Sequence, residues 1–119
     1  MKVFVTGAAG FIGSYVSRAL VWRGDSVVGF DNFNSYYPRN CKEFNVDLCH
    51  LAAGRKTQYF PHKAVEKIYQ MLEGYFPSPI SRERGYFFFI EGDIVNHDFL
   101  EYLFTKEKLD APPRQIFLW

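Results

Sequence analysis

Three glycines that follow a short apolar run constrain what this chain can fold into more than any other feature. Residues 3–6, Val-Phe-Val-Thr, are of the β-branched and aromatic types that favour a strand. Gly7, Gly10 and Gly13 come next, each three residues after the last. Glycines allow a tight turn out of a strand, close approach of a pyrophosphate to backbone N–H groups, and close packing of the next helix. The stretch predicts a strand, a turn that cradles the pyrophosphate of a dinucleotide, and a helix whose N-terminus faces that anion.

The residues after the glycines continue this pattern. Residues 11–23 have apolar positions at helical spacing, which predicts a helix that Gly24 ends. The expected sheet-facing side of this helix consists of Ile12, Val16, Ala19 and Leu20. Residues 26–30 then predict a second strand, which closes with Asp31. Asp31 follows Gly13 at close to the interval of about 20 residues that separates the glycines from a ribose-binding acid in dinucleotide sites.

Asp31 also bears on the choice of cofactor. A carboxylate that accepts from the ribose 2′-hydroxyl repels a 2′-phosphate, and Asn32 and Phe33 supply no adjacent arginine to offset the repulsion. The sequence therefore predicts NAD rather than NADP. The alternative is an ordinary glycine turn with a surface Asp31, but it leaves the order of strand, turn, helix, strand and acid unexplained.

Length and charge exclude several classes of function. The chain has 119 residues, 48% of them apolar, which suits one folded domain over residues 1–119. A formal net charge of +1 indicates neither nucleic acid nor an anionic membrane as partner. The uncharged stretch near the N-terminus is too short and too rich in glycine for a membrane span or a signal peptide, so we expect a cytoplasmic protein.

The cysteine content predicts reduced thiols. Cys41 and Cys49 form no C-x-x-C pair and cannot build a disulfide framework. With His50 and His62 they match no common zinc-ligand spacing, so no metal site is expected.

Two segments carry a resemblance to a known family. Residues 6–14, Thr-Gly-Ala-Ala-Gly-Phe-Ile-Gly-Ser, and residues 31–37, Asp-Asn-Phe-Asn-Ser-Tyr-Tyr, resemble the extended short-chain dehydrogenases/reductases of the NAD-dependent epimerase/dehydratase type. Within that family they are most similar to UDP-glucuronate 4-epimerases. The resemblance implies the N-terminal half of a three-layer Rossmann-like α/β fold with three or four parallel strands.

The resemblance also implies which residues contact the cofactor. Residues 92–94, Gly-Asp-Ile, are similar to the family's third-strand signature, in which an Asp side chain and the next backbone N–H hold the adenine. The expected NAD contacts are then Gly7, Gly10, Phe11, Ile12, Gly13, Asp31, Asn32, Asp93 and Ile94. For Asp93 an alternative stays open, an acid at a helix N-terminus near Asn96 and Asp98.

Residues 38–84 are an atypical insertion for this family, which places a single short helix there. A helix is expected over residues 62–73. Its common apolar face would hold Val65, Ile68, Met71 and Leu72. Residues 43–53 resemble the family's fourth strand and its His-Leu-Ala-Ala signature, but they precede the Gly-Asp-Ile segment instead of following it. Two readings stay open: a coincidence within a helix, or a rearranged sequence.

The last third of the chain predicts the second half of the same pattern. Residues 86–90 predict a strand buried on both faces. A helix capped by Asn96 or Asp98 should follow, and residues 115–119 predict a final short strand.

The catalytic machinery that the resemblance implies has no credible match. The family uses a Tyr-x-x-x-Lys pair far downstream, and Tyr59 with Lys63 has this spacing but places Pro61 inside it. We expect no catalytic residues and no substrate domain. The predicted function is the NAD-binding N-terminal portion of a nucleotide-sugar epimerase, which would act on a UDP-sugar only if a C-terminal half is supplied. The alternative is a non-catalytic remnant that binds NAD or a partner, with self-association through an exposed sheet edge.

Overall fold

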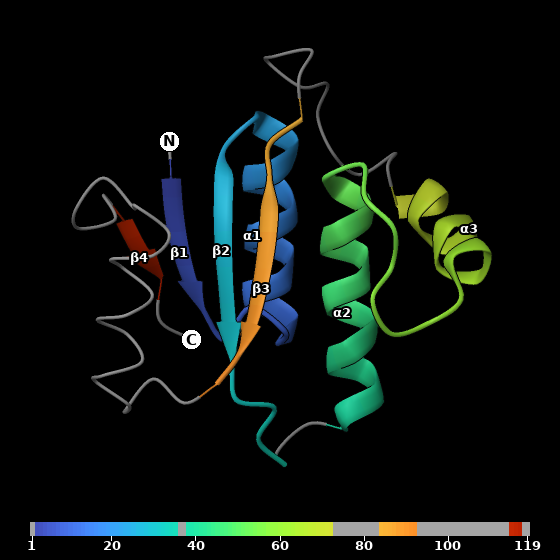
Figure 1. Ribbon diagram of the computed structural model, residues 1–119, viewed down its shortest axis with the longest axis horizontal. Helices are drawn as coiled ribbons and strands as arrows, with labels where there is room; N and C mark the ends of the chain where they lie inside the picture. Colours follow the sequence, from blue (N-terminus) through green and yellow to red (C-terminus); the bar gives the residue numbers. More distant parts are fainter. Residues whose placement is uncertain (1, 36–37, 73–83, 93–114, 118–119) are drawn as a thin grey trace.

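The sheet is built around two central parallel strands, β1 (Lys2–Thr6) and β2 (Ser26–Asp31). The computed structural model describes residues 2–35, 38–72, 84–92 and 115–117. On the far side of β2 lies β3 (Phe87–Glu91), and on the far side of β1 lies β4 (Gln115–Phe117), both parallel to their neighbours. The strand order β3-β2-β1-β4 is that of half a doubly wound nucleotide-binding sheet, so the predicted fold class is confirmed (Figure 1).

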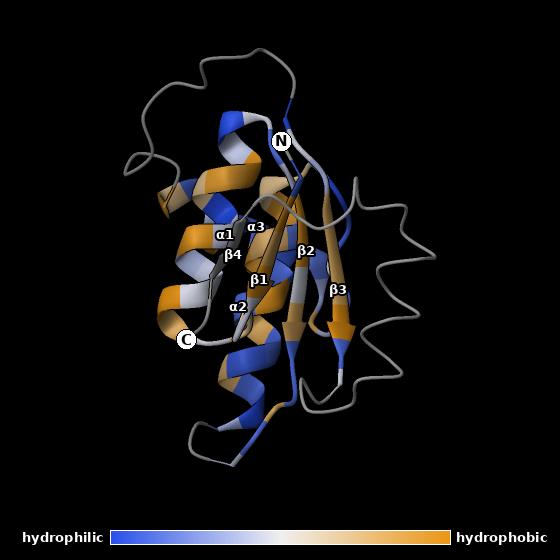
Figure 2. Cartoon of the chain, turned by 90° about the vertical axis from the view of Figure 1, so that its left-hand side faces the viewer, coloured by the Kyte–Doolittle hydropathy of each residue, from blue (hydrophilic) through white to orange (hydrophobic). Residues whose placement is uncertain are grey.

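The described helices all lie on one side of this sheet. Helix α1 (Phe11–Arg23) connects β1 to β2, and α2 (Arg39–Ala52) lies beside it (Figures 1 and 2). Helix α3 (His62–Leu72) packs on α2, farther from the sheet. The core between sheet and helices includes Val3, Val5, Val21, Val27, Val46, Leu48, Val65 and Phe87. The predicted second crossover helix falls in residues 93–114, outside the described residues.

Helix α1 has the predicted bounds and the predicted stop but buries a different face. Gly24 ends it in the left-handed conformation, with φ of 106°. The buried positions are Gly13, Ser14, Ser17, Arg18 and Val21. Ile12, expected against the sheet, is 53% exposed. The prediction was therefore wrong for Ile12, whereas Val16, Ala19 and Leu20 are half-buried. Ser17 remains satisfied when buried, since its hydroxyl donates to the Gly13 carbonyl at 2.8 Å.

The described part of the insertion, residues 38–72 and 84, contains two helices, α2 and α3, where one was expected. Residues 43–53, which resemble the family's fourth strand, lie in α2 up to Ala52 and therefore form a helix here rather than a strand. Helix α3 begins at the predicted residue, but its buried positions are Val65 and Tyr69, while Ile68 and Met71 are 42% and 72% exposed. Of the predicted apolar face, Val65 is therefore buried as expected, whereas Ile68 and Met71 are not.

Strand β3 was predicted to be buried on both faces, and that prediction was wrong. Phe87 is buried among the helices, whereas Phe88 on the opposite face is 36% exposed. Side chains alternate between the two faces of a strand, and the described helices cover only one of them.

The two cysteines occupy different environments, which gives a direct check on the position of α2. Both are free, Cys41 exposed and Cys49 buried. Burial raises the pKa of the Cys49 thiol to about 12, which suppresses the reactive thiolate. We expect iodoacetamide to label one thiol in the native chain and two in denaturant, counted by mass spectrometry. A Cys41→Ser variant should take up no label while folded; rapid labelling of it would contradict the packing of α2.

His50, near the end of α2, gives stability a pH dependence. Burial lowers the pKa of His50, whose Nε2 lies 3.0 Å from Oε1 of Gln58 and whose ring packs edge-on against Phe87. The unfolded chain then binds protons more tightly, so this contribution is complete above the unfolded pKa near 6.5 and is lost as pH falls through the lower folded value.

Urea unfolding at several pH values between 7.5 and 5.5 tests this dependence. The free energy of unfolding of the native sequence should fall more steeply toward pH 5.5 than that of a His50→Gln variant. Equal slopes would show that His50 does not titrate differently in the folded chain.

Candidate functional site

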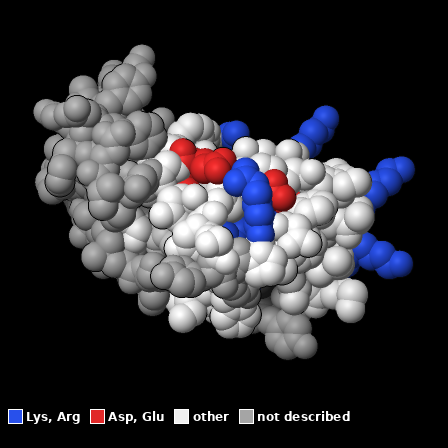
Figure 3. Space-filling view, turned by 90° about the horizontal axis from the view of Figure 1, so that it is seen from below, with Lys and Arg blue, Asp and Glu red and all other residues white. Residues whose placement is uncertain are grey.

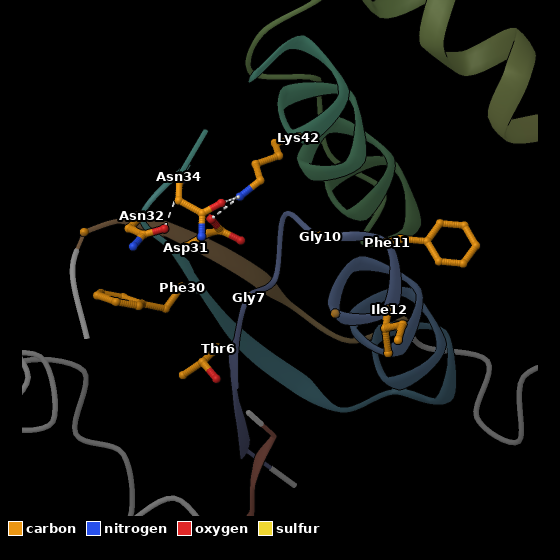
Figure 4. A pocket seen from close by; sticks show the side chains of 12 residues that line it. Thr6, Gly7, Gly10, Phe11, Ile12, Phe30, Asp31, Asn32, Asn34 and Lys42 are labelled. Atoms are coloured by element: carbon orange, nitrogen blue, oxygen red, sulfur yellow. Dashed lines mark hydrogen bonds and ion pairs between the residues drawn. The ribbon is translucent and has the colours of Figure 1, made fainter. Parts of the chain in front are cut away.

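A pocket of about 640 Å³ opens where β1 and β2 end and α1 begins (Figure 4). It is lined by Thr6, Gly7, Gly10, Phe11, Ile12, Gly13, Phe30, Asp31, Asn32, Asn34, Lys42 and Gly92. Every predicted cofactor residue that the structure describes lies in this lining. Asp93 and Ile94, the predicted adenine contacts, lie outside the described residues.

The turn that forms one wall of the pocket depends on its glycines. Gly7 has φ of 68°, a conformation that side chains disfavour, and its carbonyl accepts the Gly10 N–H at 3.0 Å. A Cβ on Gly13 would lie 2.1 Å from the Gly7 oxygen, so the third glycine is what lets α1 begin so close to the strand. These are two of the roles that the sequence predicts for a pyrophosphate cradle.

The N-terminus of α1 is open toward the pocket. Gly10 stands at the N-cap position, and within the described chain no side chain caps this end. The first turn of α1 carries no acidic residue. Unpaired N–H groups and the positive end of the helix dipole therefore face the pocket, which is where an anion would be stabilised. Phe11 and Ile12 are largely exposed and form its rim.

Asp31 lines the pocket at the end of β2 and connects two of its walls. Only 5% of this residue is exposed. Its Oδ2 accepts the Ala9 N–H at 3.1 Å, which ties it to the glycine turn, and its Oδ1 accepts the Phe33 N–H at 2.8 Å. Phe33 has φ of 51°, a strained conformation for a residue with a side chain, held by ring contacts to Tyr59 and Phe89. The loop after β2 is thus fixed around the carboxylate.

Lys42 is the site residue that sequence reasoning missed. It reaches in from α2, and its ammonium lies 3.3 Å from Oδ1 of Asp31 and 3.2 Å from Oδ1 of Asn34 (Figure 4). The expectation that nothing offsets the Asp31 charge rested on Asn32 and Phe33 alone and was incomplete, because a helix brings in a cation from farther along the chain. Lys42, Val46 and Cys49 lie on one face of α2 and are buried, a pattern at helical spacing that could have revealed Lys42.

A second contact from α2 supports the turn. The Asn45 side-chain amide donates to the Ala9 carbonyl at 2.9 Å. Helix α2 therefore holds both the turn and Asp31, although no sequence motif assigns it to the site.

The surface around this end of the sheet carries charges of both signs. Arg39 lies 3.0 Å from Glu91 and 3.6 Å from Glu43, with its guanidinium over the Phe33 ring. Figure 3, which looks at the molecule from this end, shows acidic and basic side chains next to one another among the coloured residues. No broad patch of one sign appears on this face within the described residues.

Tyr59 and Lys63, which have the spacing of a catalytic pair, lie away from the pocket. Tyr59 precedes α3 and packs on Phe33, whereas Lys63 is exposed on α3. Burial raises the pKa of Tyr59, which disfavours the phenolate that a tyrosine base needs. Across the described ranges, no three His, Cys, Asp or Glu side chains are placed to hold a metal ion. The helices described there are too short or too polar to cross a membrane.

Comparison with family models matches residues 3–111 to the NAD dependent epimerase/dehydratase family. The chain belongs to this family. This epimerase/dehydratase chain is similar to UDP-glucuronate 4-epimerase 6 of Arabidopsis thaliana, with 56% identity over 40% of the chain and 10% of the relative. UDP-glucuronate 4-epimerase 1 of the same plant is 62% identical over 40% of the chain and 11% of the relative. Protein CapI of Staphylococcus aureus is 46% identical over 36% of the chain and 13% of the relative.

These matches have two consequences for the family member described here. The resemblance predicted from the glycine turn and the Asp31 segment is confirmed. The matched regions span only 10–13% of the length of those relatives, so whatever the whole relatives do remains a proposal for this chain.

Proposed function

We propose that this chain binds NAD as the N-terminal cofactor-binding portion of a nucleotide-sugar epimerase, with a UDP-glucuronate-like sugar as the substrate of the complete site. The observation that carries the proposal is a pocket lined by both an open helix N-terminus and a buried carboxylate. A dinucleotide needs both, an anion site for its pyrophosphate and an acceptor for its ribose.

The residues present fit this cofactor. Gly10 and Gly13 bring no side chains to the helix N-terminus, and the Asp31 carboxylate, a hydrogen-bond acceptor, lines the same pocket. In the proposed complex the N-terminal turn of α1 holds the pyrophosphate, and Asp31 and Asn32 hold the adenosine ribose. Asp93 and Ile94 are proposed for the adenine. When bound, NAD supplies a hydride acceptor; the described residues bind and orient it.

NAD is favoured over NADP because Asp31 accepts hydrogen bonds and cannot donate one to a 2′-phosphate. Lys42 reduces the charge repulsion, so we expect NADP to bind more weakly than NAD but not to be excluded outright.

We assign no catalytic residue to this chain, and its action on a UDP-sugar depends on a C-terminal half that supplies a Tyr-x-x-x-Lys pair. The second candidate function is a non-catalytic NAD-binding or protein-interaction remnant, favoured by the partly exposed aromatic face of edge strand β3, which could pair with a second copy. A cytoplasmic location suits either function. The reading frame after the Trp119 codon discriminates them: a downstream Tyr-x-x-x-Lys supports the enzyme portion, and its absence supports the remnant.

Titration calorimetry with NAD tests the binding proposal. The native chain should bind, and an Asp31→Ala variant should bind about tenfold more weakly or worse, the loss of one hydrogen bond to a charged group. Asp31→Asn keeps the side-chain shape if Asp31→Ala fails to fold, and Glu66→Ala on α3 is the remote control. A folded native chain that gives no binding heat would sink the proposal.

A further inference from the structure

A second pocket, of about 390 Å³, lies at the other end of α2 from the pocket at the glycine turn. Lys42 near the start of α2 lines the pocket at the glycine turn, whereas Leu51 near its end lines the second one (Figure 1). The turn that follows α2, one face of α3 and Arg84 ahead of β3 form the rest of the lining. The volume is in the range of small-molecule sites, about 300–1,000 Å³. No residue of this lining belongs to the proposed NAD site.

The charged side chains of this second pocket are mostly positive. Arg55 and Lys56 follow α2, and Arg84 adds a third cation from a distant part of the chain. Among the described lining residues Glu66 is the only carboxylate, and its Oε2 lies 3.9 Å from Nε2 of His62. A hollow lined by an excess of one charge raises the local concentration of ions of the opposite sign. The pocket therefore favours an anion.

Aromatic rings hold both guanidinium groups in place. Cζ of Arg55 lies 4.1 Å from the centroid of the Tyr86 ring, and Cζ of Arg84 lies 4.8 Å from that of the Trp22 ring. Stacking occupies the face of a guanidinium, whereas its N–H donors point outward in the plane of the group. Side chains that are already oriented lose less conformational entropy when a ligand binds.

Capping of α2 accounts for one of the three cations. Arg84 donates to the Leu51 carbonyl at 3.5 Å, in the last turn of α2, where positive charge is favoured. Arg55 and Lys56 have no comparable task, because within the described part of the chain neither side chain has a hydrogen-bond acceptor or an ion-pair partner. Their donors are available to a ligand.

We propose that this pocket binds the phosphate group of a small organic phosphate. Such a group carries nearly two negative charges near neutral pH and presents three strong acceptor oxygens, which matches three cations. A guanidinium can pair with two phosphate oxygens through parallel hydrogen bonds, and the Lys56 ammonium adds a point charge. The rest of the pocket, along Leu51 and α3, has room for the organic part.

A titration with inorganic phosphate, followed in the amide ¹H–¹⁵N spectrum at constant ionic strength, tests this site. In the native chain the amides of residues 54–56 and 84 should shift along a saturating curve. An Arg55→Gln variant should bind phosphate about tenfold more weakly, because it loses hydrogen bonds to a charged group. Lys67→Gln removes the same charge from an exposed position of α3 outside the lining, so it should bind as the native chain does.

An Arg55→Lys variant separates the guanidinium from its charge. It keeps the charge but loses the planar fork, so its phosphate affinity should fall between those of the native chain and Arg55→Gln. Equal affinities for native, Arg55→Gln and Lys67→Gln chains would show that Arg55 does not bind phosphate, and the site would be wrong.

The native chain decides the case in which Arg55→Gln does not fold. Phosphate that shifts only residues 7–13, or shifts at residues 54–56 that grow without saturating, would overturn the site. No sample contains NAD, so a failure here leaves the proposed function standing, and a failure to bind NAD leaves this pocket untouched.

Discussion

A Gly13→Ala variant should unfold more easily than the native chain by about 2 kcal/mol, although alanine is the better helix former. Helix propensity alone favours alanine by about 1 kcal/mol. The added Cβ would stand 2.1 Å from the Gly7 oxygen and 2.7 Å from the Gly7 carbonyl carbon, both backbone atoms that no rotamer change can move. Overpacking of this kind costs about 1–3 kcal/mol and occasionally more, so the clash outweighs the propensity. Urea unfolding measures the difference.

Gly10→Ala is the matched control for this prediction. Its Cβ would lie 3.2 Å from the Gly7 oxygen, a contact that a small adjustment relieves, and it would extend into the pocket. We expect Gly10→Ala to stay close to native stability while losing NAD affinity, whereas Gly13→Ala loses both. A Gly13→Ala chain as stable as the native one would show that α1 does not approach the turn as closely as described.

Replacing Asp47 with alanine should cost about 3 kcal/mol of stability. Asp47 is completely buried, and its carboxylate accepts the N–H groups of Gln58, Tyr59 and Phe60 at 2.7, 3.0 and 2.8 Å. Each buried donor left without a partner costs about 1–3 kcal/mol, and water reaching this half-buried loop keeps the total near the lower end of the sum. Urea unfolding of the native chain and of Asp47→Ala measures this difference in the free energy of unfolding.

Two further variants define what Asp47 does. Asp47→Asn keeps one acceptor oxygen and should fall between the native chain and Asp47→Ala. Glu66→Ala removes an exposed partner of His62, 3.9 Å away, and should change stability by no more than about 0.5 kcal/mol. If Asp47→Ala matches Glu66→Ala, the carboxylate does not anchor the loop that leads into α3.

Local signals explain what could be predicted from the sequence. The glycine turn, α1 and Asp31 were predictable because the turn residues, the helical period and the spacing to the acid all act within one short segment. The buried face of α1 was not, because Gly13, Ser14, Ser17 and Arg18 lie on it and Val21 is its only buried large apolar residue. Sequence patterns detect hydrophobic residues. This helix is instead positioned by the close approach of Gly13 to the Gly7 backbone and by the buried Ser17 hydroxyl, which donates to the Gly13 carbonyl.

The part that α2 plays in the candidate site could not be predicted from the sequence, for a different reason. Its sequence resembles a strand that the family places elsewhere, and its roles come from packing against α1 and β3. Lys42 becomes a site residue only once α2 is folded against the end of β2, because its ion pair joins residues that share no motif. Asp47 likewise acts on a loop that only the tertiary structure brings to it.

The most direct test of NAD binding in the described pocket is an amide ¹H–¹⁵N spectrum of the labelled chain recorded with increasing NAD. We expect progressive shifts for residues 7–13 and 31–34 and little change on α3. Saturating NAD that leaves residues 7–13 unmoved, or that shifts only residues around Arg55 and His62 at the second, smaller pocket, would contradict the proposed site.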